Sequence, residues 1–498
     1  MDNKKLPATP ESRNALYENM GKTIESFSPI LKENIIIKEM LDEGVDNKAS
    51  KILDAFLSLN IYVQYTNIEL ASVLRASFRA SSLAEKQYNL KWINCVILEA
   101  YKHLYGYGGK RKKSLWISSI KPLFEAIGNQ EFKQDFNALE NHIIEFGKSN
   151  VTNVEKRNLS FHYDIEPISV YDMLLELSEE EEVQRIICFM NLLQDISLFI
   201  TKHIREYAVP INVESKALLK YAFTFSDFDI FQNNRDKVNS TMEEAILSHA
   251  QRLDTFIRQQ SLPELIKLQF KDIDSDSMDP IHRIIEIQKV AIQLTYLYID
   301  LASAIRAFIG SECAIEKQLS LKQVNTIIFE GYNKLYGLND DSEESFWKAY
   351  VYPVVLDSED ESIIDEFKSI DEELQSLKIK VKTFEGQRQL SVHLDKGILE
   401  IYSMLHNLNP VKELQKVLQL LNILPRVLNF LTKCLSIIDF KNQANHEKKM
   451  APTYEKIDNI ISLLMKTPSS QQKDDLIKLL EGFKTGEFFD EMKRRMRE

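Results

Sequence analysis

An all-α fold is the class that this chain predicts, and its composition carries the prediction. The 498 residues include only 14 Gly and 13 Pro. Average usage would supply far more of both, so turns should be sparse and the elements between them long. Hydrophobic residues make up 44% and aromatic residues 10% of the chain, which is enough for a packed core. This composition excludes wholesale disorder and the low-complexity classes.

The clearest predicted helix covers residues 93–104. Its apolar residues are spaced as i, i+3, i+4 and i+7, which places them on one helical face. Gly106 follows and suits the left-handed residue that ends many helices. Gly337 stands in the same place after a later helix, so we expect that helix to end in the same way.

Two more helices are predicted further along the chain. One begins near Pro167, with Asp164 or Glu166 as its capping acid. The next begins in the acidic run Glu179–Glu182, because carboxylates in a first turn interact favourably with the helix dipole. The stretch Asp272–Asp279, DIDSDSMD, has the composition of a linker.

The chain contains an internal repeat with an offset of 231 residues. The segment that begins at Leu70 reappears at Leu301 with 17 identities in 37 ungapped positions, whereas unrelated sequences would share roughly two or three. Residues 157–202 match residues 388–433 at the same offset, with 16 identities in 46 positions. We therefore predict two tandem helical-bundle repeats that pack as an intramolecular pseudo-dimer. The expected domains are residues 1–235, residues 236–470 and a C-terminal helical tail, residues 471–498.

Charge and cysteine usage limit the classes of function and location. There are 62 Lys and Arg against 74 Asp and Glu, giving a formal net charge of −12. A general nucleic-acid coat or a membrane-surface binder needs broad positive potential, so only a local basic cleft is compatible with this balance. The four cysteines are far apart, and no apolar signal-peptide core or run of 18 apolar residues occurs. We expect reduced thiols in a cytoplasmic protein that does not bind a membrane.

The strongest chemical motif is Arg-x4-His, which occurs once in each repeat. The first copy reads Arg157-Asn-Leu-Ser-Phe-His162 and the second Arg388-Gln-Leu-Ser-Val-His393. The repeats keep Arg, Leu, Ser and His here, and they also keep Asp164 and Asp395 two residues after each histidine, while their surroundings differ. A purely structural interpretation remains open, in which Arg157 pairs with a nearby acid and His162 bonds to a backbone carbonyl.

This motif in a helical context resembles the HEPN superfamily, small helical bundles whose ribonuclease members carry Arg-x4-6-His. In those enzymes the residue after Arg is usually Asn, Asp or His, so Asn158 fits and Gln389 departs from the pattern. The resemblance implies a metal-independent endoribonuclease without a cofactor, acting as a toxin or antiphage-defence effector. HEPN nucleases usually build one site from two motifs across a dimer interface, and here the two repeats would supply both.

The chemistry of the motif agrees with what the resemblance implies. Cleavage of RNA without a metal needs one group to deprotonate the 2′-hydroxyl and another to protonate the leaving oxygen. Imidazole titrates near neutral pH, so His162 and His393 suit both tasks. Arg157 and Arg388 would hold the scissile phosphate by charge-assisted hydrogen bonds. The amides of Asn158 and Gln389 would orient these groups, with Asp164 and Asp395 in support.

A basic loop is a second candidate for RNA contact. It contains Lys110, Arg111, Lys112 and Lys113, whereas the same place in the second repeat is acidic. Solvated loops that have diverged are the simpler explanation, and contact with RNA phosphate on one side is the functional one. The histidines show no spacing typical of a metal site.

Control of the expected nuclease would come from a regulatory protein or a small-molecule activator, and further oligomerisation stays open. The alternative function is a non-catalytic tandem helical module that binds a nucleotide, RNA or a partner protein.

Overall fold

The structure is a computed structural model and is all-α, as the sequence predicts. Fourteen α-helices and two short π-helices form the described part of the chain, which contains no β-strand. The described residues are 10–42, 48–106, 113–127, 129–151, 167–205, 235–269, 275–338, 345–356, 360–382, 398–440 and 462.

Residues 10–205 form what we call the N-terminal half. Its elements are α1 (Pro10–Asp42), α2 (Lys48–Arg79), α3 (Leu83–Leu104), η2 (Trp116–Ile120), α4 (Leu123–Ile127), α5 (Gln130–Asn150), α7 (Pro167–Glu176) and α8 (Glu179–Ile204).

Residues 235–440 form the C-terminal half. Its elements are α10 (Arg235–Gln269), α11 (Ser275–Gly310), α12 (Ala314–Leu335), η6 (Trp347–Val351), α13 (Tyr352–Leu356), α14 (Glu361–Lys382), α16 (Ile398–Asn407) and α17 (Pro410–Phe440).

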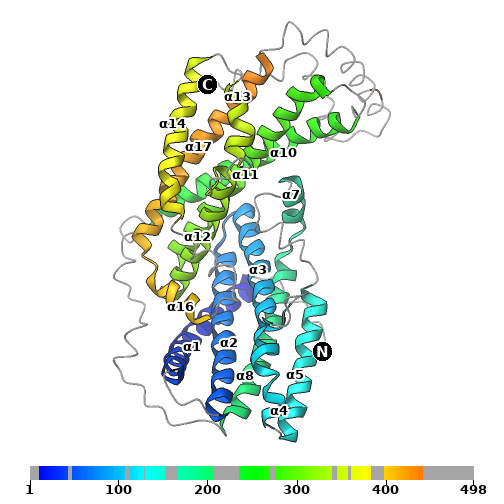
Figure 1. Ribbon diagram of the computed structural model, residues 1–498, viewed down its shortest axis with the longest axis vertical. Coiled ribbons are helices and arrows are strands. Elements are labelled where there is room, and N and C mark those ends of the chain that lie inside the picture. The colour runs from blue at the N-terminus through cyan, green and yellow to red at the C-terminus, as the bar shows by residue number, and fades with distance from the viewer. Residues whose placement is uncertain are drawn as a thin grey trace.

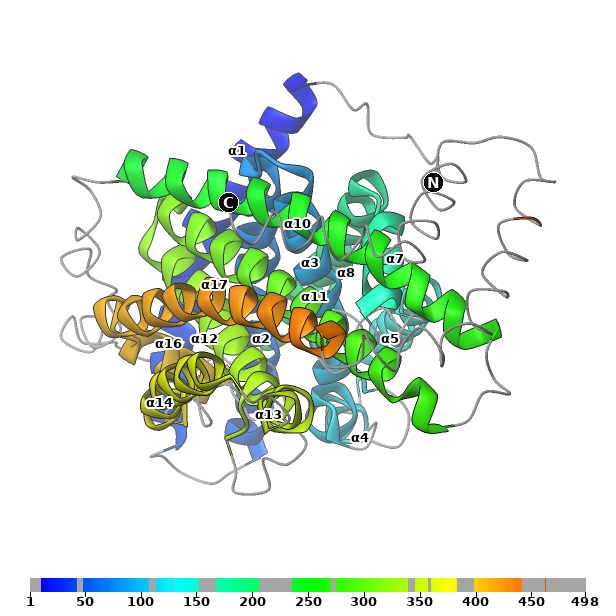
Figure 2. The same cartoon turned by 90° about the horizontal axis from the view of Figure 1, so that it is seen from above.

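The two halves follow one another along the long axis of an elongated molecule. In Figure 1 most of the N-terminal half lies below and most of the C-terminal half above, and helices α2, α3, α11 and α12 meet between them. Figure 2, seen from above, shows the same four helices near the middle. Nearly every residue of α2 and α3 after the first turns is buried. Because α2 and α3 are covered on all sides, including their polar residues, the boundary between the halves is part of the core.

Local signals account for the ends of the helices. The Ser82 hydroxyl accepts a hydrogen bond from the Glu85 backbone N–H, which caps α3. Gly106 and Gly337 have φ values of 86° and 84°, a conformation that glycine adopts without steric cost. The predicted helix before Gly106, and the predicted starts of α7 and α8, are confirmed.

One sequence prediction is wrong. The linker-like stretch Asp272–Asp279 is helical from Ser275 onward, because α11 begins there and continues to Gly310. Residues 272–274 lie outside the described residues, between the end of α10 at Gln269 and the start of α11, so the prediction fails only for residues 275–279. The proposed capping acids Asp164 and Glu166 lie outside the described residues. The proposed tail, residues 471–498, also lies outside them.

Each half has a tryptophan in a π-helix at its aromatic core. Trp116 stacks on Phe136 with ring centroids 5.0 Å apart, and Trp347 stacks on Phe367 at 4.9 Å. Both indoles are fully buried. The rings therefore serve packing.

Candidate functional site

The two Arg-x4-His motifs lie outside the described residues. These are Arg157, Asn158, His162 and Asp164 in the first copy and Arg388, Gln389, His393 and Asp395 in the second. Their positions in the chain are nevertheless matched, because segment 152–166 joins α5 to α7 and segment 383–397 joins α14 to α16. The described geometry around the motifs is therefore that of these flanking helices.

A buried polar cluster holds the end of α5 from which segment 152–166 departs. Arg185 on α8 donates through Nη2 to the backbone carbonyl of Asn150, at 2.8 Å. Its Nη1 contacts Asn94 Oδ1 and forms an ion pair with Glu182 Oε2 at 2.7 Å. Asn94 and Glu182 are each about 5% exposed. This cluster, which we call the Arg185 cluster, satisfies the carbonyl of Asn150, the last residue of α5.

The same positions in the C-terminal half carry a related cluster. Glu413 pairs with Lys416, with N–O at 3.5 Å, and also contacts Asn325. Burial raises the pKa of Glu413, and the Lys416 ammonium opposes that shift. Each of these three residues stands 231 positions after its partner in the Arg185 cluster. The Asn and Glu recur unchanged, while Lys replaces Arg.

The helices that follow the two motifs both contact the opposite half. Helix α7 lies against α11, and its Tyr171 hydroxyl donates to Asp254 Oδ1 on α10 at 2.7 Å. Helix α16 lies against α2. In Figures 1 and 2 alike, α7 lies on the right of the central helices and α16 on the left. The starts of these two helices are therefore on opposite sides of the molecule.

Four buried ion pairs cross the boundary between the halves, and two of them involve lysine. Lys91 Nζ lies 2.5 Å from Asp300 Oδ2, and Lys322 Nζ lies 2.6 Å from Glu69 Oε1. All four side chains are less than a tenth exposed. Lys322 stands 231 positions after Lys91, and Asp300 stands 231 positions after Glu69. Each half therefore supplies the lysine of one pair and, at matched positions, the acid of the other.

The other two pairs involve arginine and show the same exchange. Arg75 Nη1 lies 2.7 Å from Glu316 Oε1, and Arg306 Nη1 lies 2.8 Å from Glu85 Oε2. Burial raises the pKa of Glu85 and the Arg306 guanidinium counteracts it. Positions 306 and 316 are 231 residues after positions 75 and 85.

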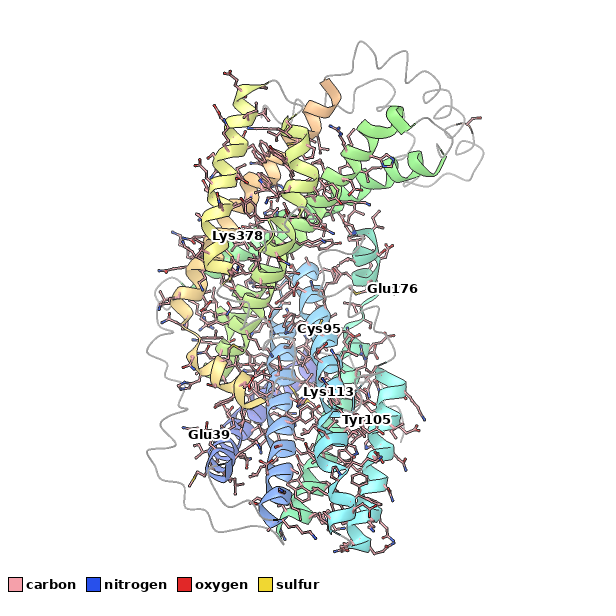
Figure 3. All side chains as sticks on the ribbon, viewed as in Figure 1. Glu39, Cys95, Tyr105, Lys113, Glu176 and Lys378 are labelled. Atoms are coloured by element: carbon pink, nitrogen blue, oxygen red, sulfur yellow. The ribbon has the colours of Figure 1, made fainter. Side chains whose placement is uncertain are left out.

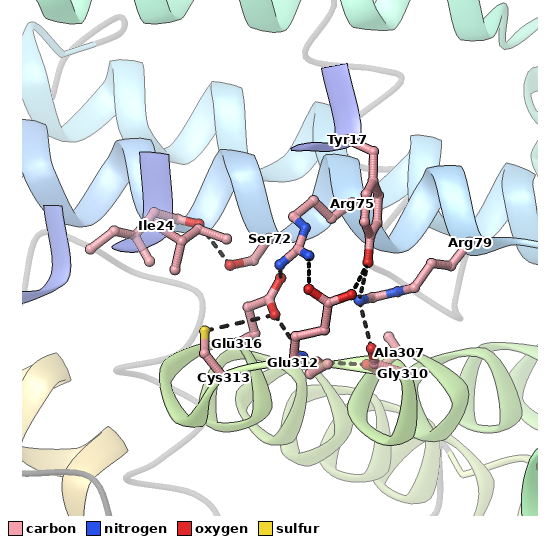
Figure 4. Close-up of polar contacts among 12 residues, drawn as sticks. Tyr17, Ile24, Ser72, Arg75, Arg79, Ala307, Gly310, Glu312, Cys313 and Glu316 are labelled. Carbon is pink, nitrogen blue, oxygen red and sulfur yellow. Dashed lines mark hydrogen bonds and ion pairs between the residues drawn. The ribbon is translucent and has the colours of Figure 1, made fainter. Parts of the chain in front are cut away.

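Figure 4 shows the surroundings of Arg75, where α1, α2 and the turn between α11 and α12 meet. Arg75 also bonds to Glu312, whose Oε1 accepts from the Tyr17 hydroxyl at 2.5 Å. The Arg75 guanidinium lies 4.4 Å from the centroid of the Tyr17 ring. Arg79 donates to the Gly310 carbonyl at 2.7 Å. Every charge in this cluster therefore has a partner, so the cluster joins the two halves and offers no free catalytic group.

The motif search did not single out these interface residues. A signal for them was present: Arg75, Glu85 and Lys91 recur unchanged 231 positions later, and they lie in helices whose other buried residues are mostly apolar. A buried charge is tolerated only when it is paired. The repeat therefore held information about the interface, although it could not show which charge faces which.

The proposed basic loop is described only at its last residue. Lys113 is exposed and stands just before η2, while Lys110, Arg111 and Lys112 lie outside the described residues (Figure 3). Tyr105, which flanks this loop, is buried and 6.3 Å from Tyr101 between ring centroids. It therefore packs in the core, where it cannot stack on a base.

A surface groove of about 410 Å³ lies between α5 and α8. Its lining residues are Asp135, Ala138, Leu139, His142, Asp195, Leu198, Phe199 and Lys202. His142 Nδ1 lies 2.9 Å from Asp195 Oδ2 at one end. At the other end Asp135 Oδ2 contacts both Lys202 Nζ, at 2.7 Å, and His203 Nε2, at 2.8 Å. Hydrogen bonding from Lys202 lowers the pKa of Asp135.

Within the described ranges, no cluster of three or more His, Cys, Asp or Glu side chains could hold a metal ion. The four cysteines are free thiols. Burial raises the pKa of Cys313 to about 11 and that of Cys434 to about 12. These two thiols are therefore protonated near neutral pH and are poor nucleophiles.

Two described helices are long and apolar enough to cross a membrane. They are Glu179–Ile204 and His282–Gly310, and in the second 94% of the apolar window is buried by other helices. Core helices share this composition, so the feature is weak evidence for a membrane span.

Neither the family models, nor the curated proteins, nor the solved structures contain a match to this chain.

Proposed function

We propose that the chain is a tandem duplication whose two halves pack as a pseudo-dimer. The bounds of α3 and α12, and of η2 and η6, differ by 231 residues. The four buried ion pairs also exchange roles at that offset. A two-fold relation between the halves accounts for both observations, because it turns each cation of one half toward an acid of the other.

On this framework we propose a metal-independent endoribonuclease that uses Arg157, His162, Arg388 and His393. One observation carries the proposal: Arg-x4-His recurs in two connections that each leave a matched helix and enter another helix at the boundary between the halves. The histidines would transfer protons and the arginines would stabilise the phosphate. Asn158, Gln389, Asp164 and Asp395 would orient these four residues.

The Arg185 cluster supports the proposal by its position. It holds the end of α5 seven residues before Arg157, so it would fix one end of the first motif segment. The cluster around Glu413 is its counterpart at the matched positions of the C-terminal half. Helices α7 and α16, which follow the two motifs, lie on opposite sides of the central helices. The motifs could therefore form one composite site or two separate sites, and the two arrangements predict different activities for the histidine variants.

The test is cleavage of a single-stranded RNA in the presence of a chelator. His162→Ala should lower the rate about 100-fold or more if the imidazole is a general acid or base. His393→Ala should lower it equally for a composite site, whereas for two separate sites each variant retains part of the activity. His282→Ala changes an exposed histidine outside both motifs and is the matched control.

Equal cleavage by all four proteins would overturn the assignment of the histidines. RNA binding without cleavage would favour the alternative, a non-catalytic tandem helical module that binds a nucleotide, RNA or a partner protein. Neutralising Lys110, Arg111, Lys112 and Lys113 should weaken RNA binding and flatten its salt dependence if that loop contacts phosphate.

The biological role proposed with this activity is that of a cytoplasmic toxin or antiphage-defence effector. Its control would come from a regulatory protein or small-molecule activator. This role depends on the resemblance to the HEPN superfamily.

A further inference from the structure

The α5/α8 groove has an acidic group at each end and an apolar floor between them. His142 and Asp135 lie seven residues apart on α5, which is about 10 Å along a helix. Asp195 pairs with His142 at one end, and Asp135 lies at the other. Leu139 and Phe199 are buried beneath the groove, while Leu198 is 61% exposed at its rim.

Each carboxylate retains an oxygen for a further partner. Both contacts of Asp135 use Oδ2, and the contact of Asp195 also uses Oδ2. The groove has one ammonium, Lys202, which is shared between Asp135 and Glu131. The lining of the groove thus holds two carboxylates, Asp135 and Asp195, against the one ammonium of Lys202, and this excess of acid attracts a positively charged ligand.

The C-terminal half holds a cation in the corresponding place. Arg426, 231 positions after Asp195, bonds to Glu373 and also donates through Nη2 to Ser369 Oγ at 3.3 Å. Glu373 and Ser369 stand 231 positions after His142 and Ala138. A guanidinium from the chain itself thus occupies that surface. In the N-terminal half Asp195 replaces the arginine and His142 replaces its acid, so the pair is reversed and a carboxylate stands where the guanidinium would be.

We propose that the α5/α8 groove binds a linear aliphatic di- or polyamine. One terminal ammonium bonds to Asp195, the other bonds to Asp135, and the methylene chain lies on Leu139, Leu198 and Phe199. Charge-assisted hydrogen bonds at both ends fix the length of the ligand, and the apolar floor favours methylene groups over a hydrated metal ion. None of the groove residues belongs to an Arg-x4-His motif, so the proposal stands or falls independently of the proposed nuclease.

The test is calorimetric titration of the full chain, without RNA, using three probes at one ionic strength. Spermidine is long enough to reach both carboxylates, ethylenediamine has two charges but is too short, and butylamine has one charge. We expect one saturable site for spermidine and affinities at least tenfold weaker for the other two probes.

Variants identify the groove. Asp195→Asn should weaken spermidine binding by about tenfold, because one charge-assisted bond is lost. The double change His142→Glu with Asp195→Arg imports the ion pair of the C-terminal half and should abolish saturable binding. Asp365→Asn removes an exposed acid of α14 and is the control for general attraction to an acidic protein.

The proposal is overturned if the three amines bind alike, if Asp195→Asn behaves as Asp365→Asn does, or if spermidine shows no saturable binding. Asp195 is half exposed, so its amide variant should fold, and circular dichroism checks this. Since no RNA is present, none of these results depends on whether the chain cleaves RNA.

Discussion

The two halves share features of their interior but differ more on their surfaces. The Trp–Phe stacks recur with centroid distances of 5.0 and 4.9 Å, and the buried ion pairs recur with their roles exchanged. On the outer face of α8 and α17, by contrast, the pair His142–Asp195 is replaced by Glu373–Arg426. Packing restricts a buried position through many neighbours at once, whereas an exposed pair needs only a partner of opposite charge. The halves therefore differ in the charges that their surfaces carry.

The largest expected effect comes from breaking an ion pair shared by the halves. Lys322→Met leaves Glu69 charged and buried, so we expect a loss of about 3–5 kcal/mol in the free energy of unfolding. Urea denaturation measures it. Adding Glu69→Gln to the same chain should restore much of the loss, because the unpaired charge is removed. Lys368→Met breaks an exposed pair on α14 and should change stability little; equal losses in the two variants would contradict burial of Lys322.

A smaller effect, on the pH dependence of stability, is expected from a histidine on α10 that has no counterpart on α1. His249 is buried against Tyr298, with ring centroids 3.8 Å apart, and burial followed by repulsion from Arg252 lowers its pKa to about 4. Glu18, 231 positions earlier, is exposed.

Because the folded state disfavours protonated His249, its stabilising contribution is complete above pH 6.5 and is lost as the pH falls toward 4. The loss at pH 5 should be about 2 kcal/mol. Denaturation of the wild type and His249→Phe at pH 7 and pH 5 measures it. A pH dependence that is the same in both proteins would contradict the assignment.

The tryptophans offer a closer comparison. Trp347 Nε1 donates to Asp371 Oδ1 at 2.9 Å, whereas the buried Nε1 of Trp116 has no hydrogen-bond partner among the described residues. Replacing each by Phe removes a similar apolar area. Trp347→Phe should therefore cost about 1 kcal/mol more than Trp116→Phe, since only the former loses a hydrogen bond to a carboxylate. Thermal or urea unfolding of the two variants gives the difference, and a reversed order would contradict it.

The smallest effect is expected on the outer face. Arg426→Ala removes a half-exposed ion pair with Glu373 and should cost less than about 1 kcal/mol. The cost should shrink further in high salt, because screening weakens exposed pairs. Denaturation at low and high ionic strength checks this. A cost that does not vary with salt would mean that Arg426 acts through packing.

Local sequence patterns were sufficient to predict the class of fold and several helix ends. The apolar spacing in residues 93–104 and the glycine at position 106 act over a few residues, and α3 ends as they indicate. DIDSDSMD misled because polar residues at a helix start resemble those of a linker. The motif residues themselves remain a prediction, since they lie outside the described residues.

The sequence by itself determined that this protein is helical, and matches at an offset of 231 residues predicted that its second half repeats the first. Only the tertiary structure decided that Lys91 faces Asp300, that His249 is buried and that Asp195 lies across a groove from Asp135. Helix formation depends on neighbours within about four residues along the chain. The pairing of Lys91 with Asp300 joins positions 209 residues apart, and long-range packing of whole helices sets such a pairing.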